Sequence, residues 1–184
     1  MQNRLSKTIF TAFFALGFAG LSAGAQASEA DRRFFDSVSG QWSGPGEIVA
    51  GKYAGTKFMC NFTGSTPDGK IGMSLDGGCR VGLFTQRMSA NIERHGRSGY
   101  RGTFMDGSQG EGLDVVSGQV TREQVIFAIN RNALNGAMQA RLSDPNTMQV
   151  TVSVRVDDTM VPVIGVNLKR SDAPRTVGST AQNH

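Results

Sequence analysis

The fold of this chain is decided by the stretch MQVTVSVRV, residues 148–156. Apolar and polar side chains alternate along it without interruption. Because successive side chains of a strand point to opposite faces, the pattern predicts a β-strand with one buried and one wetted face. After two aspartates the sequence MVPVIGVNLKR, residues 160–170, returns with a second apolar set. Pro162 cannot donate a backbone hydrogen bond, so it predicts a strand start, an edge or a bulge.

Short apolar runs of the same kind, separated by glycine and proline, fill the chain before this hairpin. Short connections join antiparallel neighbours, because parallel crossovers need about a dozen residues or more. We therefore expect a meander. The expected strands are residues 41–50, 56–64, 70–76, 79–93, 98–105, 111–121, 124–130, 134–143, 147–156 and 160–169.

A meander with one apolar face leaves two exposed edges unless the sheet closes. Closure into a barrel removes both edges, and glycines within the expected strands, such as Gly44 and Gly118, suit the bends that closure requires. The sequence thus predicts an all-β fold, an antiparallel meander of about eight to ten strands closed into a barrel. A short helical turn within residues 28–38 precedes it, and a Greek-key sandwich is the alternative.

Residues 1–27 have the three parts of a secretory signal peptide. Arg4 and Lys7 precede an uncharged apolar stretch, and Ala25 and Ala27 supply the small residues of a cleavage site. We expect a barrel domain over residues 28–170 and a disordered polar tail over residues 171–184. The mature protein would be periplasmic or secreted. It would have no membrane span, since no later apolar run approaches about 18 residues.

The charge of the chain argues against a nucleic-acid partner. There are 19 lysines and arginines and 15 acidic residues, and removal of Arg4 and Lys7 leaves 17 against 15, a net charge of +2. This excess is too small to attract a nucleic acid or an anionic surface by itself.

The chain has two cysteines, Cys60 and Cys79. Export would place them in an oxidising compartment, where a disulfide is expected. The segment TPDGK between them predicts a turn, because proline fixes φ and glycine accepts a positive φ. Folding back there brings the cysteines nearly opposite each other, with a bulge at the Gly-Gly pair before Cys79 absorbing a small difference in register. Two buried free thiols are the alternative.

The segment GQWSGPGEI, residues 40–48, resembles the Gly-x-Trp first strand of calycin-type barrels, the lipocalins, avidins and nitrobindin-type barrels. In these folds a helical turn precedes the strand and the tryptophan closes one barrel end. Phe34 to Val38, followed by Gly40 and Trp42, has this layout, so the resemblance implies that Trp42 is such a plug. The Thr-Asp-Tyr signature of lipocalins and a haem-ligating histidine pattern are absent. The chain also resembles exported alphaproteobacterial proteins.

Catalytic and metal-binding patterns are weak, and we expect neither an enzyme nor a cofactor. The histidines are His95 and His184, the last residue, so the one candidate imidazole for a nucleophile–base–acid triad is His95, which lies in an expected hairpin turn. The loop GSQGEG, residues 107–112, precedes no helix that would bind phosphate. The methionines are spread over apolar faces and predict core packing rather than a metal site.

Two functions remain from different classes. The first is binding of a small apolar or amphiphilic molecule inside the barrel; the second is a cell-envelope interaction module with a filled barrel and a protein partner. The residues expected to face the interior or its mouths are Trp42, Phe58, Phe62, Met73, Tyr100, Phe104 and Phe127. The contact surface of the alternative would consist of Arg94, His95, Arg97 and Arg101.

Overall fold

The computed structural model describes residues 23–96, 99–107 and 112–171. It contains one helix, α1 (Ala23–Val38), followed by ten strands. The strands are β1 (Gly40–Ile48), β2 (Lys57–Ser65), β3 (Gly72–Val81), β4 (Phe84–His95), β5 (Gly99–Met105), β6 (Leu113–Val120), β7 (Gln124–Arg131), β8 (Leu134–Asp144), β9 (Thr147–Val156) and β10 (Thr159–Arg170). The expected all-β class is confirmed.

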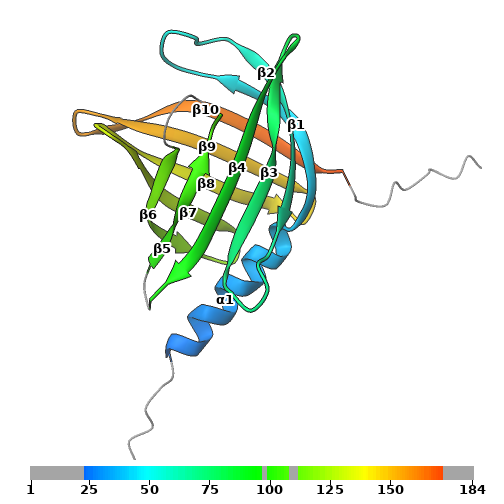
Figure 1. Ribbon diagram of the computed structural model, residues 1–184, viewed down its shortest axis with the longest axis vertical. Helices are drawn as coiled ribbons and strands as arrows, with labels where there is room; N and C mark the ends of the chain where they lie inside the picture. Colours follow the sequence, from blue (N-terminus) through cyan, green and yellow to red (C-terminus); the bar gives the residue numbers. More distant parts are fainter. Residues whose placement is uncertain (1–22, 97–98, 108–111, 172–184) are drawn as a thin grey trace, which may run out of the picture.

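The ten strands form a closed antiparallel barrel (Figure 1). Each strand pairs with its neighbours in sequence, and β1 pairs with β10 to close the sheet, with Trp42 opposite Arg170. The predicted closed meander is therefore confirmed, and the sandwich alternative is wrong. Closure leaves the described strands without a free sheet edge.

The turn between β3 and β4 lies later than the sequence predicts. We expected strands 70–76 and 79–93 with a break at Gly77 and Gly78, but both glycines are inside β3 and the chain turns at Gly82 and Leu83. A Cβ at Gly77 would overlap the backbone carbonyl of Asn61 in β2. The pair thus allows close approach of neighbouring strands instead of making a turn.

Two local predictions concern register. The predicted irregularity at Pro162 is confirmed: the register of β9 and β10 shifts between Pro162 and Ile164. Cys60 and Cys79 form the expected disulfide, with Cα atoms 4.0 Å apart. They are direct partners in an unbroken β2–β3 register, so the bulge proposed beside Cys79 is not needed.

Helix α1 lies across one end of the barrel, in contact with β2, β3 and β6 (Figure 1). Phe34, Phe35 and Val38 are buried, so the apolar side of the predicted helical turn faces the barrel. The helix begins at Ala23, before the expected cleavage site. The predicted signal peptide up to residue 22, and the predicted tail from residue 172, lie outside the described residues.

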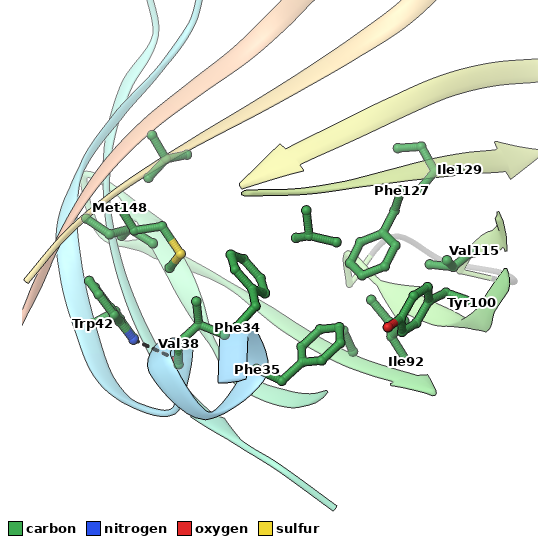
Figure 2. Packing of buried hydrophobic residues seen from close by; sticks show 14 of the residues in the cluster. Phe34, Phe35, Val38, Trp42, Ile92, Tyr100, Val115, Phe127, Ile129 and Met148 are labelled. Atoms are coloured by element: carbon green, nitrogen blue, oxygen red, sulfur yellow. Dashed lines mark hydrogen bonds between the residues drawn. The ribbon is translucent and has the colours of Figure 1, made fainter. Parts of the chain in front are cut away.

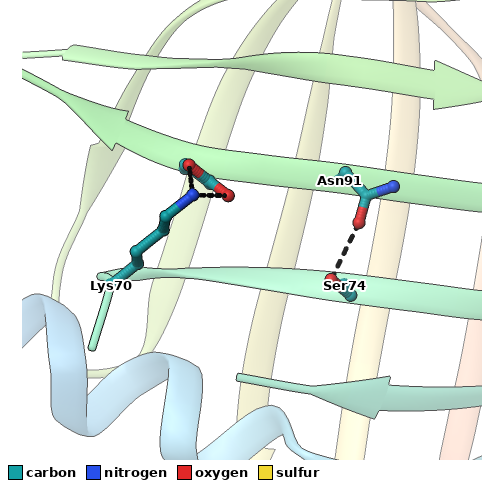
Figure 3. Close-up of polar contacts among 4 residues, drawn as sticks. Lys70, Ser74 and Asn91 are labelled. Carbon is teal, nitrogen blue, oxygen red and sulfur yellow. Dashed lines mark hydrogen bonds and ion pairs between the residues drawn. The ribbon is translucent and has the colours of Figure 1, made fainter. Parts of the chain in front are cut away.

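The outer wall of the barrel is polar where β3 and β4 pass beside α1. The Lys70 ammonium lies 2.8 Å from both carboxylate oxygens of Glu93, and the Ser74 hydroxyl donates to Asn91 Oδ1 at 2.8 Å (Figure 3). Both pairs are exposed. The alternation predicted for single strands thus separates an inner apolar face from an outer polar face.

Candidate ligand cavity

A cavity of about 330 Å³ runs through the interior of the barrel. All ten strands and α1 contribute to its wall, and among the described residues of that wall only Gln86 and Asp106 carry an amide or a carboxylate. The apolar lining includes Phe34, Val38, Trp42, Ile48, Phe58, Phe62, Met73, Leu75, Met88, Ile92, Phe104, Leu113, Phe127, Met138, Ala140, Met148, Val150, Val152, Ile164, Val166 and Leu168. Small-molecule pockets of proteins usually hold about 300–1,000 Å³, so this one suits a small ligand.

The cavity exists partly because inner positions of β1 have no side chain. Trp42 and Ile48 face the interior, and Gly44 and Gly46 occupy the inward positions between them. A Cβ at Gly46 would overlap the ring of its cross-strand partner Phe58. The glycines therefore let the Phe58 ring lie against the barrel wall while the centre stays open.

Trp42 forms the floor of the cavity together with α1. Its indole Nε1 donates to the carbonyl oxygen of Val38 at 2.9 Å, the dashed line in Figure 2. The Arg170 guanidinium lies 4.4 Å from the centre of the indole ring and donates to the carbonyl oxygens of Ser37 and Ser39, both at 2.6 Å. Ser37 is in the last turn of α1 and Ser39 directly follows the helix, so Arg170 caps α1 and holds Trp42 in place. Trp42 is thus both a plug and a cavity residue.

A second polar group fixes the helix from the other side. Asp31 on α1 is buried, and its Oδ2 accepts hydrogen bonds from Arg94 at 2.9 Å and from the Tyr100 hydroxyl at 2.6 Å. The Tyr100 ring packs against Phe35 and Phe127, with ring centres 5.5 and 5.8 Å away. Burial raises the pKa of the Tyr100 phenol far above its ordinary value, and the bond to the Asp31 carboxylate adds to the effect.

The mouth of the cavity is at the end opposite α1. Val81, at the end of β3, lines the cavity and is 44% exposed, so solvent reaches the cavity beside it. Gln86 and Asp106 line the same end, and a Cβ at Gly107 would overlap the Gln86 amide, so this amide lies against the residue that follows Asp106. They form a polar corner on an otherwise apolar wall.

Arg131 adjoins this polar corner through Asp106, without lining the cavity itself. It follows Phe127 and Ile129 in the inward-facing series of β7, and its guanidinium lies 2.7 Å from Asp106 Oδ2. The Arg131 Nε atom is buried and has no hydrogen-bond partner among the described residues. A buried donor without an acceptor is costly, so an oxygen atom of a bound molecule would be stabilised here.

The structure brings most of the predicted interior residues together. Trp42, Phe58, Phe62, Met73, Phe104 and Phe127 all line the cavity. Tyr100 does not: it is buried beside the cavity, and its hydroxyl is used by Asp31. The sequence presents Tyr100 as an aromatic side chain on an apolar face, and only the tertiary structure reveals its acidic partner.

The predicted cationic surface is largely dispersed. Arg94 is half-buried in its ion pair with Asp31, and Arg101 donates to the carbonyl oxygen of Tyr100. His95 is exposed at the end of β4, and Arg97 lies outside the described residues. Asp31, 63 residues earlier in the chain, holds the Arg94 guanidinium, so this member of the predicted contact surface is engaged within the protein.

Sequence reasoning did not identify the polar corner of Gln86, Asp106 and Arg131. Two signals were available. Gln86 lies on the same face of β4 as Met88 and Ile92, and Arg131 lies on the same face of β7 as Phe127 and Ile129. A polar residue in line with apolar ones is informative. Asp106 directly follows β5, where no periodic pattern places it.

Comparison with known proteins supports the fold and does not assign a family. No protein-family model and no curated protein matches this chain. Among solved structures, the chain is similar to the crystal structure of Rv2717c from M. tuberculosis, with a TM-score of 0.59 and 11% identity over 76% of this chain and 96% of the other. The expected calycin-like barrel therefore fits coarsely, as a closed ten-stranded antiparallel barrel. No helix in the described residues is long and apolar enough to cross a membrane.

Proposed function

We propose that this protein binds a small amphiphilic molecule in the barrel interior, with the apolar body in the cavity and the polar end at the mouth. The observation that carries the proposal is the continuous apolar wall, which in the described part of the chain is interrupted only by Gln86 and Asp106. An interior of this kind excludes a fully polar ligand, whose groups would lose their hydrogen bonds with water. A cavity of about 330 Å³ also argues against the alternative of a filled barrel.

The polar end of the ligand would carry a hydrogen-bond acceptor such as a carboxylate or an ester carbonyl. Arg131 supports this assignment because its buried Nε has no described acceptor, although its guanidinium is paired with Asp106. The Gln86 amide beside them supplies a further donor.

The role is one of binding rather than catalysis. His95 is at the α1 end of the barrel, whereas the polar corner is at the mouth, so no imidazole of the described residues accompanies Asp106. We also propose an extracytoplasmic location, supported by the Cys60–Cys79 disulfide and by the signal-like residues 1–27.

The test uses dansyl-undecanoic acid, an amphiphile whose dansyl group accepts energy from Trp42, the only tryptophan in the chain. Ala140→Phe fills the cavity, and Ala137→Phe adds the same ring on the outer face of the same strand, because residues 137 and 140 face opposite sides. We expect Ala140→Phe to abolish energy transfer and Ala137→Phe to retain it.

A second pair of measurements tests the polar end. Arg131→Gln should weaken the carboxylate probe about tenfold, as expected for the loss of a charged hydrogen bond. It should leave binding of the uncharged probe diphenylhexatriene within about twofold. Equal binding of the carboxylate probe by wild type and Ala140→Phe would overturn the proposal.

A further inference from the structure

The mouth of the barrel carries nearly all of the large apolar side chains that the described surface exposes. Ten of these eleven residues lie on the mouth half of their strands or in the connecting turns, and Ile126 on the wall is the exception. The ten are Val49, Tyr53, Met59, Val81, Leu83, Phe84, Met105, Leu134, Val156 and Met160. Scattered apolar residues are normal on a protein surface, whereas their concentration at one end indicates a contact.

The most exposed of them lie on two neighbouring projections. Leu83 and Phe84, at the β3–β4 tip, are 97% and 84% exposed, and Tyr53, in the β1–β2 loop, is 62% exposed. Figure 1 shows this cyan loop and the green β3–β4 tip on the side of the barrel opposite α1. Since β2 and β3 are paired, the two projections are adjacent. We call Val49, Tyr53, Leu83 and Phe84 the apolar tips.

The charge around the apolar tips is positive. Lys52, Lys57, Arg80 and Arg87 are exposed on these two projections, and Glu47 is their one acidic residue among the described positions. The Lys52 ammonium lies 5.4 Å from the centre of the Tyr53 ring. The neighbouring β9–β10 turn differs, because it carries Asp157 and Asp158. The mouth thus has a cationic apolar side formed by the β1–β2 and β3–β4 projections, next to a turn with two aspartates.

We propose that the apolar tips dock the barrel mouth on the surface of an anionic phospholipid bilayer. Isolated apolar side chains on protruding turns can enter the headgroup region separately, and neighbouring lysines and arginines can reach lipid phosphates. A flat protein partner would instead favour a contiguous apolar patch. The inference rests in part on the proposed function, because an amphiphile that leaves a bilayer would enter the cavity through the same mouth.

The test is cosedimentation of the full chain with vesicles of phosphatidylcholine alone or mixed with phosphatidylglycerol. We expect binding to the mixed vesicles and a decrease of at least about tenfold for the double variant Leu83→Ser/Phe84→Ser, which removes two large apolar side chains from the interface. The control Ile126→Ser removes an exposed apolar side chain from the wall and should bind like wild type. Lys52→Gln should lower binding about fivefold at low salt.

Dansyl-undecanoic acid, added without vesicles, separates the two proposals. If wild type binds this probe but not the mixed vesicles, the docking inference is overturned and the cavity function stands. If Leu83→Ser/Phe84→Ser binds vesicles as well as wild type, docking by the apolar tips is wrong. Light scattering tests whether the apolar tips instead bind a second copy of the chain. If wild type is a dimer that does not bind vesicles, and the double variant is a monomer, the tips form a dimer contact and the proposal is overturned. Vesicle binding without probe binding would refute the cavity function alone.

Discussion

Tyr100→Phe tests how α1 is held on the barrel. The change removes one oxygen atom and keeps the ring between Phe35 and Phe127. Asp31 then loses the 2.6 Å hydrogen bond and keeps the one from Arg94. Because a hydrogen bond to a charged group contributes about 1.5–3 kcal/mol, we expect the free energy of unfolding at pH 7 to fall by that amount. The melting temperature of a domain of this size should drop by roughly 3–12 °C.

The pH dependence provides a second and more specific readout. The pKa of Tyr100 is raised in the folded protein, so its contribution to stability is fully present below the unfolded pKa of about 10. As the pH rises above this value the unfolded chain ionises while the folded phenol stays protonated, and stability is lost by up to about 1.4 kcal/mol per pH unit. Tyr100→Phe should remove this component of the alkaline loss.

Urea denaturation followed by Trp42 fluorescence measures both quantities, at pH 7 and at several values above pH 10. Trp42 is a suitable probe because it packs against the end of the same helix. The control Tyr53→Phe alters an exposed ring and should change stability by less than about 0.5 kcal/mol. A loss below about 0.5 kcal/mol for Tyr100→Phe, or an alkaline slope equal to that of wild type, would refute the reasoning.

Three further changes test other parts of the structure. Replacing Cys60 and Cys79 together by alanine should lower stability by about 3 kcal/mol, since the bridge closes a loop of 19 residues, and a loss under about 1 kcal/mol in urea denaturation would contradict this. Arg170→Met removes the hydrogen bonds that cap α1 and the cation over the Trp42 ring, so we expect the free energy of unfolding to fall by about 2 kcal/mol and the Trp42 fluorescence emission to change. An unchanged emission spectrum would argue against the contact between Arg170 and Trp42. Gly44→Ala places a Cβ against a backbone carbonyl of β10 and should lower the free energy of unfolding by about 1–3 kcal/mol. An unchanged melting temperature would show that the paired strands β1 and β10 accommodate the added methyl group.

The interior of the barrel follows closely from local sequence. Alternation in residues 148–156 placed Met148, Val150 and Val152 on one face, and these residues line the cavity. Such a pattern is decisive because a strand has a period of two and only one face of this sheet is apolar. Turn positions were less certain, as Gly77 shows, since a glycine serves equally in a turn or where two backbones approach.

The sequence by itself determined the all-β class, the meander, the cysteine pair and the aromatic side chains that face inward, because each of these depends on residues near one another in the chain. The tertiary structure alone decided that the interior is hollow, that Asp31 holds Arg94 and Tyr100, and that Gln86, Asp106 and Arg131 meet at the mouth. These features join strands far apart in sequence. Cavity volume and partner choice depend on how the closed sheet packs, and no local period encodes either.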